Sequence, residues 1–143
     1  MTKCILTAAE RVQQALSGPT PLADSLTVPE AVARLSSAAH RLETALLREG
    51  LTAIDGRIGL LFSNATEAGE ELGVFWTRGE KVGHVLTKLE AMESVRPVGL
   101  VYGVADHEVN MGRLWARPLV SGEDAAARMQ MAKEIFKLPA IIR

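Results

Sequence analysis

The sequence has one cysteine, Cys4, and no apolar stretch approaching the roughly 20 residues that a membrane-spanning helix needs. A lone cysteine cannot form a disulfide within the chain. The N-terminus also lacks a charged region followed by a long apolar segment. These absences favour a reducing, intracellular setting, and we expect a cytoplasmic protein that does not enter a membrane.

The sequence also lacks an excess of charge of either sign. Sixteen basic and seventeen acidic side chains leave a formal net charge of −1. This balance gives no overall electrostatic reason to expect nucleic acid, a membrane surface or a polyanion as partner. Locally, residues 111–143 hold six basic and three acidic side chains, which keeps nucleic acid open as a possible partner.

Length and composition indicate an ordinary globular fold. A chain of 143 residues matches one domain of common size and can bury roughly 70% of its unfolded surface. Hydrophobic residues make up 48% of the sequence and charged residues 23%, without the polar bias typical of disorder. We therefore expect a single α+β domain over residues 1–143, with a helical part at 1–50 and a sheet-containing part at 51–143.

Four segments have the spacing of helices. In residues 7–16 and 27–49, a threonine followed three positions later by a glutamate predicts a capping box, and Gly50 ends the longer helix. Its apolar stripe consists of Val32, Leu35, Ala39, Leu42 and Leu46. A middle helix is predicted at 81–95. The last helix is predicted at 123–137, with Ser121 as its cap and with core contacts from Ala127, Ala132, Ile135 and Phe136.

Five segments are typical of strands, at residues 51–54, 57–62, 73–78, 98–105 and 112–120. Asp55-Gly56 between two apolar runs predicts a hairpin turn. The polar residues 63–72 are expected to form a loop or one helical turn. The fold predicted from this order is an antiparallel sheet of about five strands, with two N-terminal helices, a middle helix and a C-terminal helix packed on it.

Asp106-His107-Glu108 is the first cluster that could carry chemistry. Adjacent side chains in a turn point in different directions, so this run is expected to be a solvated hairpin tip. A metal site would need His107 and Glu108 to meet His40 or His84 across the fold. Gly79 and Gly83, at the entry to the middle helix, are spaced unlike either common phosphate-binding motif, and a turn followed by a helix start explains them.

Catalytic motifs are absent from the sequence. Serines and threonines occur without a nucleophile elbow, and the histidines lack the spacing of a metal site. We predict no catalytic residue, metal or cofactor and lean against an enzyme. A small enzyme or ligand-binding domain stays an alternative, because catalytic groups can converge from distant positions.

Two predicted strands each place an arginine two residues from a tryptophan, and these residues are the binding candidates. Strand alternation puts Arg113, Trp115 and Arg117 on one face, opposite Leu114 and Ala116. In the other strand it groups Val74, Trp76 and Arg78 opposite Phe75 and Thr77. If Gly103 faces Trp115 in the sheet, the indole can lie flat over it.

These strands support a docking surface, because aromatic and arginine side chains are enriched at protein interfaces. The alternative is that both tryptophans belong to the core. We predict a non-catalytic protein-binding or regulatory domain that forms a homodimer through a helix face or a sheet edge. The main alternative is a nucleic-acid-binding protein that uses the Trp/Arg face, since the same pair can stack bases and neutralise phosphates.

Overall fold

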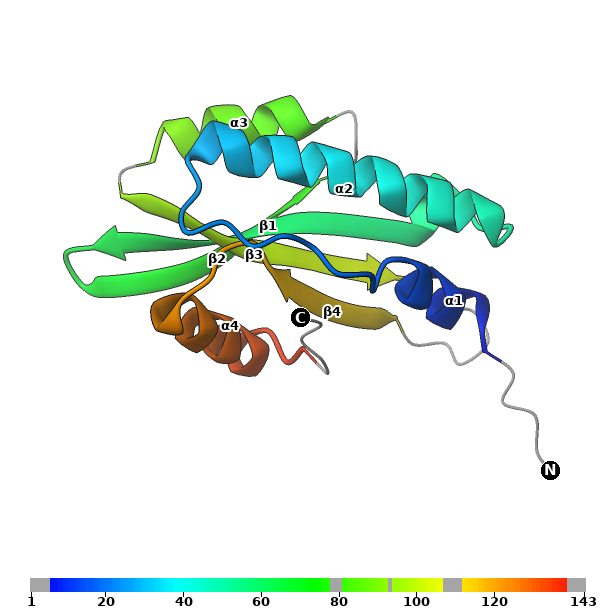
Figure 1. Ribbon diagram of the computed structural model, residues 1–143. Coiled ribbons are helices and arrows are strands. Elements are labelled where there is room, and N and C mark those ends of the chain that lie inside the picture. The colour runs from blue at the N-terminus through cyan, green and yellow to red at the C-terminus, as the bar shows by residue number, and fades with distance from the viewer. Residues whose placement is uncertain (1–5, 78–80, 93, 107–111, 139–143) are drawn as a thin grey trace.

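A computed structural model describes residues 6–77, 81–92, 94–106 and 112–138 of the chain. The elements follow in the order α1 (Ala8–Ala15), α2 (Val28–Arg48), a short 3-10 helix η1 (Ala53–Asp55), β1 (Gly56–Thr66), β2 (Gly69–Thr77), α3 (Val82–Glu90), β3 (Val95–Val104), β4 (Arg113–Pro118) and α4 (Glu123–Ile135) (Figure 1). The α+β class predicted from the sequence is confirmed.

Both N-terminal helices begin at capping boxes, as predicted. The Thr7 hydroxyl accepts from the Glu10 backbone N–H at 3.2 Å, and Thr27 and Glu30 repeat the arrangement at the start of α2. These contacts satisfy backbone donors that a helix start leaves unpaired. The predicted apolar stripe of α2 is buried throughout. Local sequence therefore sets these helix starts and the buried face of α2.

Over the described residues the sheet has four antiparallel strands in the order β2-β1-β3-β4, and not the five that we expected. The hairpin predicted at Asp55-Gly56 is wrong. The Asp55 carboxylate accepts from the Thr52 backbone N–H at 2.8 Å and closes η1. Gly56 is extended, with φ −131°, and lacks the positive φ that a two-residue hairpin turn requires. Residues 51–54 consequently form no strand.

The β hairpin lies further along the chain, in the segment expected to be a loop or one helical turn. Thr66 pairs with Gly69, and the Thr66 hydroxyl donates to the Gly69 carbonyl at 2.8 Å. Gly69 has φ +124°, which explains a glycine here. The polar residues before and after the turn belong to the ends of β1 and β2, where the hairpin extends beyond the helices (Figure 1).

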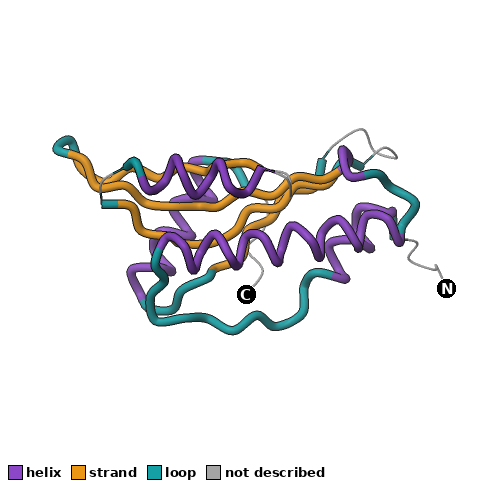
Figure 2. The backbone as a smooth tube through the Cα atoms, turned by 90° about the horizontal axis from the view of Figure 1, so that it is seen from above, coloured by secondary structure: helices purple, strands orange, loops and turns teal. Residues whose placement is uncertain are grey.

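Helices cover both faces of the sheet. Helices α2 and α3 lie side by side on one face, and α4 lies on the other (Figures 1 and 2). The larger core joins α1, α2 and α3 to the first face, whereas the smaller core joins Met129 and Ala132 of α4 to the second. Strand side chains alternate between these cores, so that Leu60 enters the larger and Leu61 the smaller.

The contacts of α4 differ from those predicted. Gly122, with φ +107°, precedes the helix, while the Ser121 hydroxyl contacts the Ala23 carbonyl at 3.4 Å instead of capping it. The buried residues of α4 are Ala125, Met129 and Ala132, so only Ala132 was identified as a fully buried core contact. Ala127 and Ile135 are exposed and Phe136 is half-buried. Within the described residues, no helix is both long and apolar enough to cross a membrane.

Candidate binding surfaces at the two edges of the sheet

Trp115, on the edge strand β4, is fully buried. Its side chain has 0% exposure and stacks on Tyr102 of β3, with ring centroids 5.0 Å apart and an interplanar angle of 3°. Trp115 pairs with Tyr102, whereas Gly103 pairs with Leu114, so the predicted register with Gly103 facing Trp115 is wrong. Trp115 also belongs to the larger core, on the face that α2 covers. The indole is thus a core side chain.

Arg117 and Arg113 of β4 hold the N-terminal part of the chain. Arg117 is only 6% exposed, and its two terminal nitrogens donate to the carbonyls of Leu16 and Gly18. Arg113 donates from Nε to Gln13 Oε1 of α1 at 2.9 Å. The fork geometry of a guanidinium suits such paired acceptors. Both arginines therefore bind α1 and the segment that follows it.

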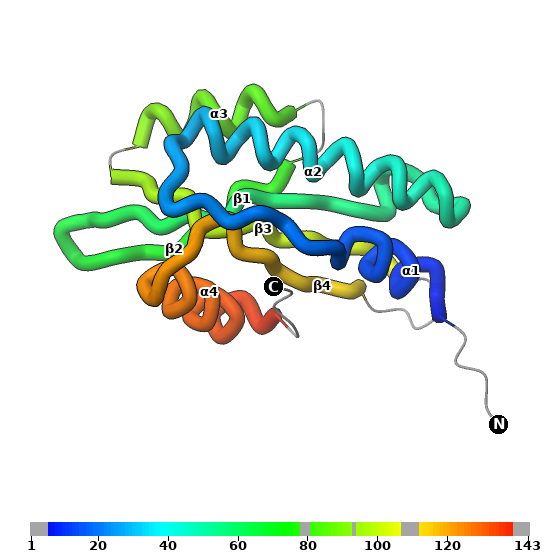
Figure 3. The backbone as a smooth tube through the Cα atoms, viewed as in Figure 1, coloured from blue at the N-terminus to red at the C-terminus, as the bar shows by residue number. Residues whose placement is uncertain are grey.

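The connection between α1 and α2 pairs with the chain just beyond β4. The Ala23 N–H donates to the Leu119 carbonyl at 3.0 Å, and the Ser121 N–H donates to the Ala23 carbonyl at 2.9 Å. Ala23 thereby forms a parallel bridge with Val120. Figure 3 shows this connection running past β4 from α1 to α2. Backbone groups just beyond β4 are thus paired within the chain itself.

The side chains predicted to share one face of β4 do share it, but this face points into the protein. Arg113, Trp115 and Arg117 share one side of the strand, as the alternation predicted. Their side is covered, so Trp115 and Arg117 offer almost no surface to a protein or a nucleic acid in this structure. Docking through this strand stays a prediction, and in this structure α1 packs beside the strand.

Trp76, on the opposite edge strand β2, is 39% exposed. It lies on the α4 side of the sheet with Val74, while Phe75 joins the larger core on the other side. The Arg57 guanidinium lies 4.1 Å from the centroid of the Trp76 ring. A cation over an indole face is a favourable arrangement, and it fixes both side chains on the surface. Arg78, the fifth binding candidate, lies outside the described residues.

A glycine in β1 lets the β2 side chains lie flat. A Cβ atom on Gly59 would come within 2.5 Å of Val74 Cγ1 and 3.2 Å of Trp76 Cε3. Both β2 side chains thus fold over a position that has no side chain of its own. The sequence analysis assigned such a role to Gly103 and Trp115, but the structure assigns it to Gly59 and Trp76.

The other side of β2 carries a second aromatic and cationic group. Phe75 stacks on Phe62 of β1 with ring centroids 5.0 Å apart, and Lys88 Nζ of α3 lies 6.0 Å from the Phe75 centroid. We refer to the half-buried and exposed side chains of this edge as the β2 surface: Arg57, Leu72, Val74, Phe75, Trp76 and Lys88. Across the described residues, no strand or bridge pairs with the outer side of β2.

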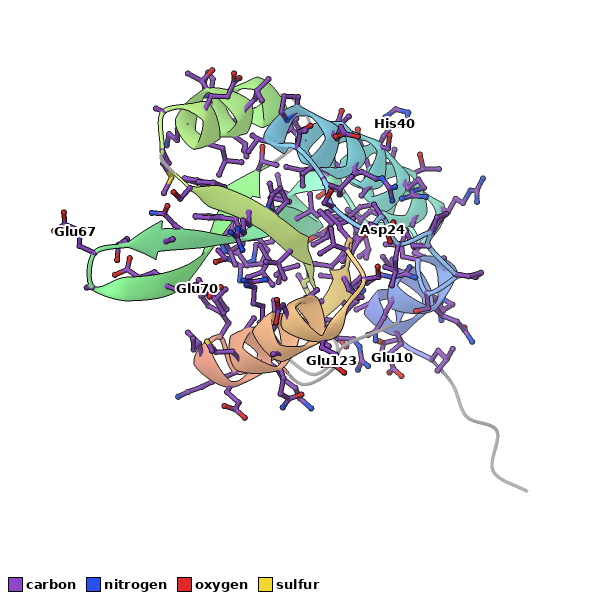
Figure 4. The ribbon with its side chains drawn as sticks, turned by 60° about the vertical axis from the view of Figure 1, so that its left-hand side comes forward. Glu10, Asp24, His40, Glu67, Glu70 and Glu123 are labelled. Carbon is purple, nitrogen blue, oxygen red and sulfur yellow. The ribbon has the colours of Figure 1, made fainter. Side chains whose placement is uncertain are left out.

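The hairpin tip next to the β2 surface is acidic. Glu67 and Glu71 are exposed, and Glu70 accepts hydrogen bonds from Arg128 of α4 and from the Ser63 hydroxyl (Figure 4). These bonds hold the pKa of the Glu70 carboxyl below its ordinary value, with Arg128 as the main cause. The carboxylates lie at one end of β2, and Arg57 and Lys88 lie towards the other.

The acidic run near His107 is only partly described. The Asp106 carboxylate is buried and accepts from the Thr7 hydroxyl at 3.1 Å, while His107 and Glu108 lie outside the described residues. His40 and His84 are exposed on α2 and α3. Among the described side chains, no three His, Cys, Asp or Glu residues are grouped to hold a metal ion. Gly83 lies within α3, and Gly79 falls outside the description.

A cavity of about 660 Å³ lies at the start of α4. Its lining includes Arg96 and Arg128 but also Asp24, Glu123 and Asp124, so the cavity carries charges of both signs. Arg128 is already bonded to Glu70. The Ser121 hydroxyl donates to Asp24 Oδ1 at 3.4 Å there, and no histidine lines the described part of this cavity.

Comparison with protein-family models, with curated proteins and with solved structures finds no match to this chain. Any inference about its function therefore depends on the surfaces described above. Sequence analysis identified Trp76 but missed Arg57, Phe75 and Lys88. Arg57 and Lys88 come from β1 and α3, and only the register β1 against β2 and the packing of α3 bring them to β2.

Proposed function

We propose that the chain is a non-catalytic protein-binding domain that associates with a second copy of itself through the β2 surface. The observation that carries the proposal is the outer edge of β2, which pairs with no strand that the structure describes and lies beside a 39% exposed tryptophan. An edge strand has a row of backbone donors and acceptors ready to pair with another strand. Tryptophan and arginine are also the side chains that most often dominate binding energy at interfaces.

The contrast between the two edges favours a closed dimer. The connection at Ala23 pairs with the backbone just beyond β4, whereas no described segment pairs with the outer edge of β2. A surface that pairs with its own copy about a two-fold axis closes after one contact, whereas two open edges would allow an extended assembly. The proposal is therefore a homodimer and not a fibre.

The nucleic-acid alternative rests on the Trp/Arg sheet face and on the basic C-terminal third of the chain. The burial of Trp115 and Arg117 does not favour it. Trp76 with Arg57 could stack a base, but the acidic hairpin tip beside them opposes a polyanion. No observation in the described cavities supports the enzyme alternative.

The test is the mass of the purified protein in solution across a range of micromolar concentrations. The mass should approach twice the 15.4 kDa of one chain as concentration rises. Trp76→Ala should weaken the dimer about tenfold or more, because an interface tryptophan is a frequent hot spot. Ile54→Ala is the matched control, since Ile54 is 72% exposed but lies outside the β2 surface.

A mass equal to one chain at every concentration would overturn the proposal. An equal response to Trp76→Ala and Ile54→Ala would place the interface elsewhere. Bound nucleic acid would appear in the same measurement as additional mass with ultraviolet absorbance at the nucleobase band, and would support the alternative.

A further inference from the structure

We infer that the two copies join β2 to β2 in antiparallel register with Val74 at the two-fold axis, which makes one continuous sheet from the four strands of each copy. This inference rests on the proposed function and specifies its geometry. It follows from three features of the described residues: the fit of opposed side chains, the glycine that lies opposite the partner's Phe75, and the positions of the charges.

The first feature is the fit of side chains in this register. With Val74 opposite the partner's Val74, Leu72 lies opposite the partner's Trp76, and Gly73 lies opposite the partner's Phe75. Directly opposed side chains contact one another across an antiparallel pair. Valine, leucine and tryptophan then form one apolar row on the α4 side of both sheets. The half-buried side chains of β2 thus gain the cover that one chain does not supply.

The second feature is Gly73, which this register places opposite the partner's Phe75. A Cβ atom on Gly73 would come within 2.7 Å of Phe62 Cζ, so the Phe62 ring already lies above this glycine. The partner's Phe75 would lie directly beside Gly73 on the same face. Since Phe62 and Phe75 stack within each chain, the dimer would bring four phenylalanine rings together at its centre.

The third feature is charge complementarity along the strand. Glu71 lies in the first half of β2, and Lys88 lies above Phe75 in the second half. Antiparallel pairing about Val74 places Glu71 opposite the partner's Thr77, next to the partner's Phe75 and Lys88. Both copies make this contact, so the interface gains two ion pairs. Charges that attract across an interface help to fix its register.

Two other registers place like charges together. Moving the axis towards the hairpin tip brings Glu71 to face the partner's Glu71. Moving it towards the end of β2 brings Trp76, with Arg57 above it, to face its own copy. Like charges that directly oppose each other across a strand pair are destabilising. The register about Val74 avoids both of these contacts.

A charge exchange tests this register. Glu71→Lys and Lys88→Glu should each raise the dimer dissociation constant on the order of tenfold, because each turns two attractions into two repulsions. When the two variants are mixed, both contacts become attractive again. The mixture should therefore contain mostly heterodimer, which native mass spectrometry resolves from the two homodimers.

The matched control is Glu123→Lys, the same charge change at the start of α4, far from the hairpin (Figure 4). It should leave the dimer unchanged at moderate ionic strength. The melting temperature of each variant, measured at a concentration where the protein is monomeric, separates a fault in folding from a fault in association. A dimer that ignores both β2 charge variants, or a statistical mixture of the two, would overturn the register.

A disulfide test locates the two-fold axis independently. In a Cys4→Ser background, Val74→Cys should link to itself on oxidation, because opposed Cα atoms in an antiparallel pair lie within disulfide reach. Glu71→Cys should not link, since its two copies lie six positions apart along the pair, roughly 20 Å. Rapid linkage at position 71 and none at 74 would contradict the inference while leaving the homodimer itself intact. A wild-type chain that stays monomeric would instead remove the proposed function as well.

Discussion

The two edge strands of the sheet carry one tryptophan each, and these tryptophans differ in their exposure to solvent. Trp115 of β4 is fully buried and lies against Tyr102, whereas Trp76 of β2 is 39% exposed and lies beneath Arg57. The two indoles also face opposite sides of the sheet. One tryptophan thus stabilises the core, and the other contributes to a surface together with Arg57.

The difference comes from what the chain packs beside each edge. At β4, Arg117 binds the carbonyls of Leu16 and Gly18, and Ala23 pairs with the backbone beyond the strand. At β2, α3 packs on one face but no described segment covers the edge itself. Proteins commonly cover or charge an edge strand to prevent unwanted pairing. Here one edge is covered, and the other has acidic residues only at its first half.

Replacing each tryptophan with alanine should give the largest difference in stability between the two edges. Trp115→Ala should lower the free energy of unfolding by about 3–5 kcal/mol, because it empties a large volume in the core. Trp76→Ala should cost the monomer less than about 1 kcal/mol, because much of this indole already contacts solvent. Urea unfolding of both variants, at a concentration where the protein is monomeric, measures the difference. Equal losses would show that the contrast between core and surface is wrong.

The sequence predicted the helices well because their signals are local. Capping boxes and a 3.6-residue apolar period act within one helix, and both starts and the buried face of α2 agree with the structure. The hairpin failed for an equally local reason. Asp55 prefers a hydrogen bond to the Thr52 backbone over a hairpin turn with Gly56, and Asp-Gly alone does not distinguish these outcomes.

For the candidate site, the sequence predicted only how side chains alternate between the two faces of a strand. Alternation gave the correct partition of Arg113, Trp115 and Arg117 from their neighbours. It could not tell which face would be covered, because the covering contact joins Arg117 to Leu16, 101 residues away in the sequence. Burial of Trp115 is therefore a tertiary effect. The same holds for Arg57 over Trp76, which depends on the register of β1 against β2.

Removing the guanidinium of Arg117 should open the covered edge. Arg117→Met keeps much of the apolar stem but leaves the Leu16 and Gly18 carbonyls without their donor, which should cost about 1.5–3 kcal/mol. Amide exchange of Ala23 and Ser121, whose N–H groups pair across this edge, should become faster. Arg117→Lys is the control, because one ammonium cannot reproduce the two-nitrogen fork and should recover only part of the loss. Unchanged exchange at Ala23 would show that Arg117 does not hold the connection.

Alkaline pH should destabilise the packing around Trp115, and acidic pH should destabilise the hairpin at the β2 edge. Burial raises the pKa of the Tyr102 phenol beside Trp115, although Arg117 and Arg41 oppose the shift. The unfolded phenol ionises near a pH of about 10, so this stabilisation is complete below that pH and is lost as pH rises towards the higher folded-state pKa. Tyr102→Phe should unfold with a flatter alkaline profile than the wild type. The same slope in both proteins would exclude Tyr102 as the cause.

At the β2 edge the sign is reversed and the effect is smaller. The pKa of Glu70 is lowered by hydrogen bonds from Arg128 and then Ser63, so its stabilisation is present above the ordinary glutamate pKa and is lost as pH falls through the lower folded-state pKa. An exposed pair of this kind contributes less than about 1 kcal/mol. Glu70→Gln should therefore reduce the acid sensitivity of unfolding slightly and leave the alkaline profile unchanged. Because Arg128 belongs to α4, loss of this bond should also speed amide exchange in the β1–β2 hairpin before it affects β4. Exchange that accelerates first in β4 on acidification would contradict the assignment of Glu70 to the open edge.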